Sequence, residues 1–225
     1  MAFQLNSVVP WGRNIDEYRT MFLLTDGDMK KKIAGFGDGP ASFNLEAKNI
    51  GSSVTSFDPI YQFTTEQLKA RIDEVRVTVM QQMSGNKDNY VWTKIKSLDE
   101  LERTRMSAMN KFLEDYDLGK SEGRYIYHEL PNKLDFDDNT FDIGLSSHFL
   151  LMYTALGYDF HIKAINEMLR VCKEVRIFPI CDLDAKDSEL IDSVIDYYKN
   201  KFSVEIKDTE YEFQRGASRV LVIKK

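Results

Sequence analysis

Apolar residues recur along the chain in two spacings, one typical of helices and one typical of strands. Residues 14–25 carry apolar side chains at helical spacing. Residues 31–34 then form a short apolar strand that ends at three alternate glycines, and residues 41–48 continue as a helix before Gly51. The order of strand, glycine loop and helix predicts one half of a βαβ unit.

The same alternation continues to the C-terminus. It predicts strands at 52–59, 124–130, 141–150 and 174–180, helices at 64–83, 160–172 and 188–201, and closing strands at 202–208 and 218–225. Because no helix separates the last two strands, we expect them to form an antiparallel hairpin. The predicted fold class is α/β, with a Rossmann-like seven-stranded, mostly parallel sheet, an antiparallel last strand and helices on both faces.

The length of the chain favours a single domain with one insertion. With 225 residues, 43% of them hydrophobic, residues 1–225 can bury one large core but not two. Residues 84–123 interrupt the alternation with a loop, a charged amphipathic helix at 98–116 and a second loop. We expect this insertion to cover the pocket as a helical lid that excludes water, and a dimerisation arm in a homodimer is the alternative.

Charge and composition exclude several classes of protein. The 36 acidic and 30 basic residues give a net charge of -6 and are mixed along the chain, which argues against nucleic acid as a partner. No apolar run approaches the roughly 20 residues that span a bilayer, and the first residues show no basic region followed by an apolar stretch, so we expect a cytoplasmic protein without a membrane partner. Cys172 and Cys181 are too few for a disulfide framework or a zinc site, so we expect reduced thiols and no metal.

The glycine loop is the first candidate for chemistry. Gly35, Gly37 and Gly39 follow the first strand, where ligands of open parallel sheets bind. Pro40 would open the next helix, whose free N–H groups favour an anion. The third glycine of the dinucleotide pattern would fall at Pro40, so a carboxylate fits this loop better than a pyrophosphate. An ordinary tight turn is the plainer interpretation.

Asp58 is the second candidate. It lies 21 residues after Gly37, at the end of the second predicted strand, where an acidic side chain accepts hydrogen bonds from ribose hydroxyls. The plainer interpretation is an acid that caps the helix beginning near Thr64. A glycine loop that favours a carboxylate and an acid that favours a ribose together suggest S-adenosylmethionine, which contains both groups.

Several motifs carry a family resemblance. "GFGDG", "SFDPIY" and "LDFDDNTFDIGLSSH" resemble motif I, the ribose acid and the fourth-strand motif of class I S-adenosylmethionine-dependent methyltransferases, over residues 30–83 and 124–225. "PWGR", "GDGPASFN", "DPIYQF" and "SSHFLLMY" resemble a little-characterised bacterial branch of that superfamily. The arrangement of seven strands with the last inserted antiparallel is also that of class I methyltransferases.

The resemblance implies a set of cofactor-binding residues. These are Gly35, Phe36, Gly37 and Asp38 at the methionine part, Asp58 at the ribose, Pro59 and Ile60 at the adenine face, His128, Glu129 and Leu130 at the adenine edge, and Ser146 in the fourth-strand motif. One position departs from the pattern, because Ile33 stands where the family has an acid. Asp38 is the candidate partner for the methionine ammonium group, unless it only caps the following helix.

His148 is the candidate catalytic residue. It follows the fourth strand at the same edge as the glycines and could accept a proton from the methyl acceptor, although it could equally line the pocket or bond to backbone. His161 opens a helix and is interpreted as structural. Trp11 and Tyr153 are expected in the pocket wall or in the core.

The resemblance also narrows the acceptor. Amino-methylating DNA enzymes carry an Asp/Asn-Pro-Pro-Tyr/Phe loop where residues 146–149 are Ser-Ser-His-Phe here, and the glutamate pair of arginine methyltransferases is missing. We therefore expect methyl transfer to an O, N or S atom of a small molecule. A non-catalytic regulatory or scaffold protein that binds S-adenosylmethionine or a nucleotide is the alternative. A nicotinamide-dependent oxidoreductase is opposed by Pro40 and by the antiparallel ending.

Overall fold

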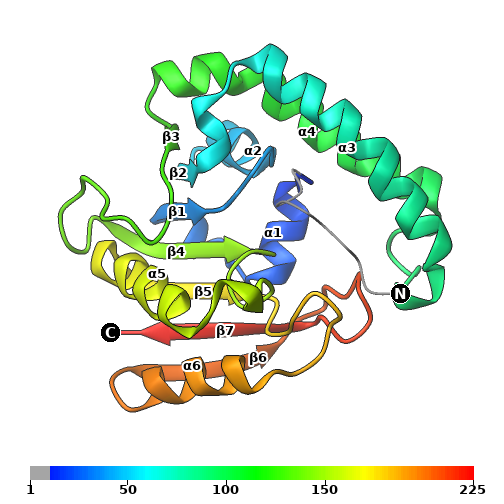
Figure 1. The fold of residues 1–225 in the computed structure, drawn as a ribbon. Helices are drawn as coiled ribbons and strands as arrows, with labels where there is room; N and C mark the ends of the chain where they lie inside the picture. The colour runs from blue at the N-terminus through cyan, green and yellow to red at the C-terminus, as the bar shows by residue number, and fades with distance from the viewer. Residues whose placement is uncertain (1–10) are drawn as a thin grey trace.

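The computed structural model describes residues 11–225, so Pro10 of the "PWGR" motif lies outside the described residues. Its centre is a seven-stranded sheet in the order β3-β2-β1-β4-β5-β7-β6 (Figure 1). The strands are β1 Lys32–Phe36, β2 Ser53–Asp58, β3 Tyr125–Tyr127, β4 Phe141–Ser147, β5 Cys172–Phe178, β6 Ser203–Asp208 and β7 Arg219–Lys224. β7 runs antiparallel to both β5 and β6, whereas the pairs among β1 to β5 are parallel. The predicted sheet is confirmed.

Helices cover both faces of the sheet, as predicted. The helices are α1 Ile15–Met21, α2 Phe43–Asn49, α3 Thr65–Gly85, α4 Leu98–Ser121, α5 Tyr158–Val171 and α6 Glu189–Lys199. Side chains of α5 and α6 share one buried cluster with the sheet, and side chains of α1 and α2 share a second cluster with its other face. Both faces of the central strands are therefore buried, which explains their nearly continuous apolar sequence.

The ends of several elements differ from the predicted ones, and the differences matter for the site. β1 runs through Phe36, so Gly35 lies within the strand instead of the turn. α2 begins at Phe43, because the amide of Ser42 donates a hydrogen bond to the carbonyl of Arg13 and holds the preceding residues outside the helix. Pro40 therefore does not open a helix, which corrects that part of the prediction, whereas a carboxylate site at the glycine loop stays a prediction. β3 and β4 end early, which leaves His128 and His148 in loops.

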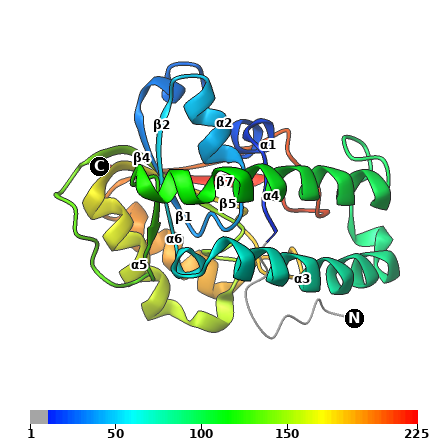
Figure 2. The same cartoon turned by 90° about the horizontal axis from the view of Figure 1, so that it is seen from above.

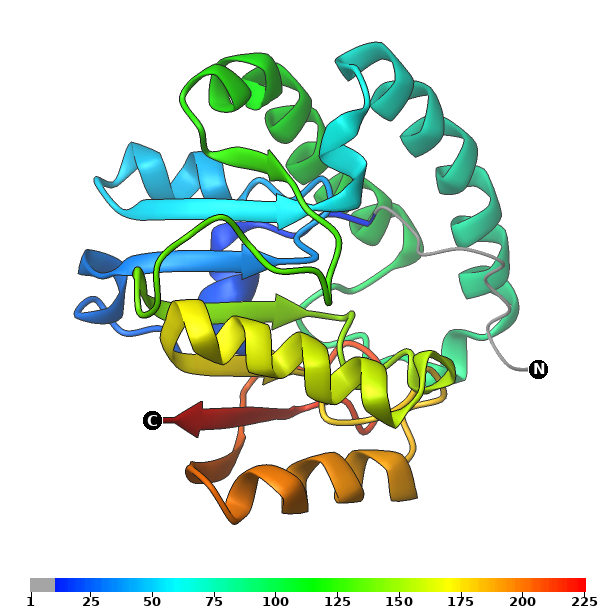
Figure 3. The same cartoon turned by 60° about the vertical axis from the view of Figure 1, so that its left-hand side comes forward.

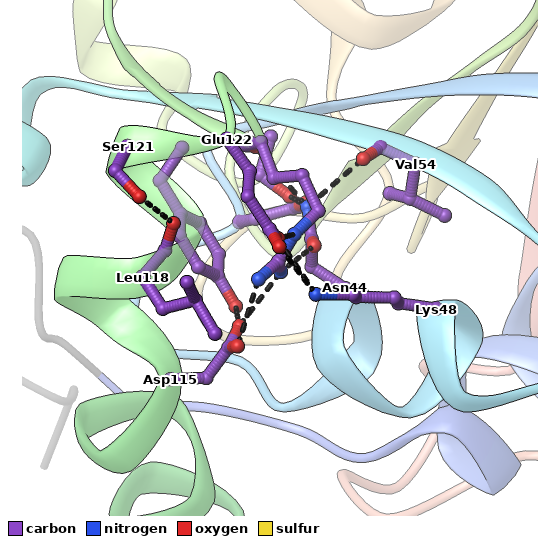
Figure 4. Close-up of polar contacts among 11 residues, drawn as sticks. Asn44, Lys48, Val54, Asp115, Leu118, Ser121 and Glu122 are labelled. Carbon is purple, nitrogen blue, oxygen red and sulfur yellow. Dashed lines mark hydrogen bonds and ion pairs between the residues drawn. The ribbon is translucent and has the colours of Figure 1, made fainter.

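Helices α3 and α4 pack against each other and form an arm, defined here as residues 65–121 (Figures 1 and 2). The arm lies beyond the carboxyl ends of the parallel strands, which point toward it in Figure 3. Its base is held near the sheet by a polar network (Figure 4). Arg124 donates to both carboxylate oxygens of Asp115 on α4 at 2.7 Å, and to Asn44 on α2 at 2.7 Å. This buried ion pair fixes the C-terminal end of α4 against α2 and β3.

The far tip of the arm contacts a distant part of the same chain, the loop between β6 and β7. The amide of Val91 donates to the carbonyl of Phe213 at 2.8 Å, and the amide of Arg215 donates to the carbonyl of Asn89 at 2.9 Å. The rings of Tyr90 and Phe213 stack with centroids 5.1 Å apart. We call these contacts the tip latch. They attach the tip of the arm to the β6–β7 loop, so both the base and the tip of the arm contact the rest of the chain.

Candidate active site

A cavity of about 820 Å³ lies between the carboxyl ends of the strands and the arm. This size is within the range of ligand pockets, roughly 300–1,000 Å³. Its wall is built from the loop after β1, the end of β2, the loops after β3 and β4, the arm and the β6–β7 loop. Residues of the predicted insertion, such as Asn86 and Tyr90, line this cavity, and its action as a lid stays a prediction.

The glycine loop forms one end of this cavity. Gly39 has a φ of +57°, and a Cβ placed on it would meet no atom within 4 Å, so the space beside it is open to a ligand. Gly35 is required for a different reason, because a Cβ there would lie 1.8 Å from a carboxylate oxygen of Asp38. The carboxylate of Asp38 therefore folds back over β1.

Asp38 is buried in the cavity wall and held in one orientation. Its carboxylate accepts hydrogen bonds from the hydroxyl of Tyr18 at 2.8 Å and from the hydroxyl of Ser56 at 2.6 Å. Burial raises the pKa of Asp38 to about 6, against the lowering effect of these two hydrogen bonds, and the nearby charge of Asp58 raises it further. The carboxylate is thus mostly ionised at neutral pH without any cationic partner among the causes of its shift.

Asp58 lies at the end of β2, where the sequence predicts it. One of its oxygens accepts from the amide of Gly39 at 2.8 Å and the other from the amide of Ile60 at 2.9 Å, so it caps the 3-10 helix Pro59–Gln62. Thr64, and not Asp58, caps α3. Burial raises the pKa of Asp58 to about 6, and the two amide bonds oppose this rise. Each oxygen keeps lone-pair capacity for a further donor.

These features fit the end of S-adenosylmethionine that carries the ribose and amino acid. Two buried carboxylates face a cavity beside an open glycine, and a ribose diol and an ammonium group are donors that such carboxylates accept. Other predicted cofactor residues line the same cavity, namely Phe36, Gly37, Pro59, Ile60, His128, Glu129 and Leu130. Gly35 and Ser146 do not line it. Asp38 covers Gly35, and Ser146 is fully buried within β4.

His148 lies in the loop after β4 and lines the cavity. Its φ of +54° is in the left-handed region, which is unfavourable for a residue with a Cβ and is often found at functional sites. Ser147 Oγ and His148 Nδ1 share a hydrogen bond of 2.9 Å. Burial, together with the cations of Arg13 and Arg105, lowers the pKa of His148 well below its usual range. The imidazole is therefore neutral at pH 7.

Sequence reasoning missed a charged cluster in the wall of the cavity. Arg105 of α4 is completely buried, and its Nη1 lies 2.6 Å from both carboxylate oxygens of Glu17. Tyr211 accepts a hydrogen bond from Arg105 and donates one to Glu17. Arg13 lines the same region. Only Arg13 carried a signal in the sequence, as part of "PWGR", because nothing in the pattern of α4 distinguishes Arg105 from its exposed basic neighbours.

Of the remaining candidates, Trp11 and Tyr153 line the cavity wall. His161 is buried, and its Nδ1 bonds to the carbonyl of Gly157 at 2.7 Å, which agrees with a structural role. Cys172 and Cys181 are free, buried thiols. Among residues 11–225, no group of three His, Cys, Asp or Glu side chains is arranged to hold a metal ion. No helix in the described part of the chain combines the length and the apolar surface needed to cross a membrane.

Comparison with known proteins places the chain in a family. It is 36% identical over 223 residues to the uncharacterized protein MJ0045 of Methanocaldococcus jannaschii, and the match covers 98% of each chain. The chain belongs to the MJ0045 family. No protein-family model matches this MJ0045 relative.

Solved structures show the fold of this MJ0045 relative. A structure from work on the conversion of a disulfide bond into a thioacetal group during echinomycin biosynthesis matches 95% of this chain and 82% of its own, with 11% identity and a TM-score of 0.50. Magnesium protoporphyrin IX methyltransferase of Synechocystis PCC 6803 with bound S-adenosylhomocysteine matches 94% and 81%, with 11% identity and a TM-score of 0.49. The strand order β3-β2-β1-β4-β5-β7-β6, with β7 antiparallel, is that of the class I S-adenosylmethionine-dependent methyltransferase fold.

Proposed function

We propose that the protein is an S-adenosylmethionine-dependent methyltransferase that transfers a methyl group to an O, N or S atom of a small molecule. The observation that carries this proposal is Asp58. Its buried carboxylate faces the cavity at the end of β2, beside the open space at Gly39, and has capacity for the two hydroxyls of a ribose.

Different residues around the cavity would bind the cofactor and align the methyl acceptor. Asp58 would accept the ribose hydroxyls, and Asp38, held by Tyr18 and Ser56, would pair with the methionine ammonium group in place of the acid missing at Ile33. The bound cofactor supplies an activated methyl group for in-line displacement by the acceptor. The arm covers the cavity and would exclude water from the cofactor's positive charge.

His148 would contact the acceptor. Because its imidazole is neutral at pH 7, it can accept a hydrogen bond from the nucleophilic group, and it can take a proton from an acceptor that must lose one. An acceptor that reacts without losing a proton needs only the alignment. The His148→Asn variant should therefore bind S-adenosylhomocysteine as the wild type does and transfer methyl groups more slowly.

Binding is the first test. Calorimetric titration should give saturable binding of S-adenosylhomocysteine and none of NAD. The Asp58→Ala variant removes a charged hydrogen-bond acceptor and should weaken binding by about 1.5–3 kcal/mol. Asp73→Ala, on an exposed part of α3, is the matched control and should change nothing. Equal affinity in wild type and Asp58→Ala would show that the ribose lies elsewhere.

Transfer is the second test. Methyl-tritiated S-adenosylmethionine and the protein should label a compound in a metabolite extract, and the Asp58→Ala variant should label it less. Saturable binding of S-adenosylhomocysteine without any label transfer would instead support a regulatory or scaffold protein that keeps the pocket.

A further inference from the structure

The cavity is lined by more residues than those proposed for the cofactor, two arginines among them. Arg13 and Arg105 both line it, whereas Glu17 is the only carboxylate bonded to either of them among residues 11–225. Glu17 is already engaged by Arg105 and Tyr211. The cluster therefore carries one positive charge more than it can neutralise.

Arg13 holds that excess charge. Within residues 11–225, no carboxylate oxygen lies within 4 Å of its guanidinium, which donates to the carbonyl of Trp11 at 3.3 Å and also hydrogen-bonds to the side chain of Tyr211. Its Nε is buried and has no partner in the described part of the chain. Arg13 is partly buried, and an anion would satisfy donors of its guanidinium that the described residues leave unused, because the planar fork matches carboxylate or phosphate oxygens.

The surface beside Arg13 is apolar. Trp11 packs against the arm cluster that contains Val79, Met83, Tyr90 and Phe213, and these side chains line the cavity. A molecule with one end on the guanidinium can therefore lay an aromatic or aliphatic body against this cluster. The cationic side chains at the cavity rim, Lys186 and Arg215, are exposed to solvent and attract anions far less selectively.

We propose that the methyl acceptor is an organic anion whose carboxylate or phosphate binds Arg13 and whose apolar body packs between Trp11 and the tip of the arm. The identification of the bound anion as the methyl acceptor rests on the proposed function, whereas the anion site itself does not. The depressed pKa of His148, caused by burial and then by the two arginines, is consistent with the positive potential that such a site needs.

Naphthalene probes test the site directly. The protein, with and without saturating S-adenosylhomocysteine, is titrated with 2-naphthoate, 2-naphthyl phosphate and the neutral 2-naphthamide. At least one anion should bind ten times more tightly than the amide. Arg13→Gln should abolish this preference, and Arg13→Lys should retain part of it. Arg19→Gln, which removes the same charge from the exposed side of α1, is the control and should leave it within twofold.

The outcomes separate the two proposals. If neither anion is preferred by the wild type, or if the preference survives in Arg13→Gln, the anion site is wrong. If S-adenosylhomocysteine does not bind, the proposed function fails, while the titrations without it still decide the anion site. Unchanged affinity of Arg13→Gln for S-adenosylhomocysteine shows that the variant is folded and that the substitution leaves the cofactor site intact.

Discussion

Two carboxyl groups, those of Asp38 and Asp58, are buried in the cavity wall with raised pKa values of about 6. Neither forms an ion pair with a described residue. In the protein without ligand, burial therefore penalises their ionised forms, and donors on a ligand would relieve the penalty. The residues that make the site fit a cofactor thus make the empty protein less stable.

The stability of the Asp58→Asn variant tests this cost. Above pH 6 the folded wild type must hold Asp58 ionised, whereas below about pH 4 both folded and unfolded chains hold it protonated. The folded state binds more protons between these values, so the contribution of Asp58 to stability falls as pH rises. In Asp58→Asn one carboxylate oxygen becomes an NH2 group that cannot accept from the amide of Gly39 or Ile60, a loss that does not depend on pH. On top of this constant loss, the stability of Asp58→Asn relative to the wild type should rise between pH 4 and pH 8, on the order of 2 kcal/mol.

Denaturant unfolding at pH 4, 6 and 8 measures the difference. Comparing the variant with the wild type at each pH cancels the opposite contribution of groups such as Asp28, whose pKa is lowered. A stability difference between variant and wild type that does not change from pH 4 to pH 8 would contradict the account of a buried carboxylate with a raised pKa. The same variant should lose affinity for S-adenosylhomocysteine, because an amide donates where the ribose needs an acceptor.

At this scale the sequence predicts part of the site. Asp58 and Gly39 were predictable because their roles depend on local spacing after a strand. Arg105 and Glu17 were not, because their pairing joins α4 to α1 across 88 residues. For Ser146 a role in cofactor binding stays a prediction, although its neighbour Ser147 is the serine of β4 that lines the cavity, since successive residues of a strand face opposite sides.

At the scale of elements, the arm decides access to the cavity. Its base is fixed by Arg124 and Asp115, and its tip contacts residues 213–215 through the latch and belongs to a buried cluster that contains Met83 and Tyr90. The hydrogen bonds of the latch join the tip to the β6–β7 loop, so their protection reports whether the tip opens. Whether the arm also joins two copies of the chain stays a prediction, as does its opening as a lid.

Substitution of Phe213 tests the latch. Phe213→Ala removes the stacked ring over Tyr90, and the amides of Val91 and Arg215 should then exchange hydrogen about ten times faster. Phe202→Ala, a ring beside Tyr198 and remote from the arm, is the control and should leave these two amides unchanged. Unaltered exchange in Phe213→Ala would mean that the latch contacts do not hold the tip.

The sequence predicted the insertion at residues 84–123 but not the contacts that its tip makes with the rest of the chain. Residues 98–116 have a clear amphipathic pattern, and α4 was predicted within a few residues of its observed ends. The latch could not be predicted, because backbone hydrogen bonds between residues 89–91 and 213–215 leave no trace in side-chain periodicity. The start of α2 was placed too early for a similar reason, since a backbone bond from Ser42 to Arg13 outweighs the helix-starting tendency of Pro40.

For the molecule as a whole, the strand order and the position of the cavity both agree with the class I methyltransferase fold. Parallel strands bring the loops after β1, β2 and β4 to one edge, and the antiparallel β7 completes the class I methyltransferase fold. This architecture was predictable because it follows from hydrophobic periodicity and from one connection too short for a crossover. The chemistry of the acceptor was not, since it depends on side chains that meet only in the folded cavity.

A crystal structure of the protein with S-adenosylhomocysteine is the most direct measurement of the central claim. We expect both ribose hydroxyls within hydrogen-bond distance, about 3 Å, of the Asp58 carboxylate and the amino group beside Asp38. The sulfur atom should face the part of the cavity between His148 and Arg13. A ligand bound outside this cavity, or bound within it with the ribose away from Asp58, would contradict the account.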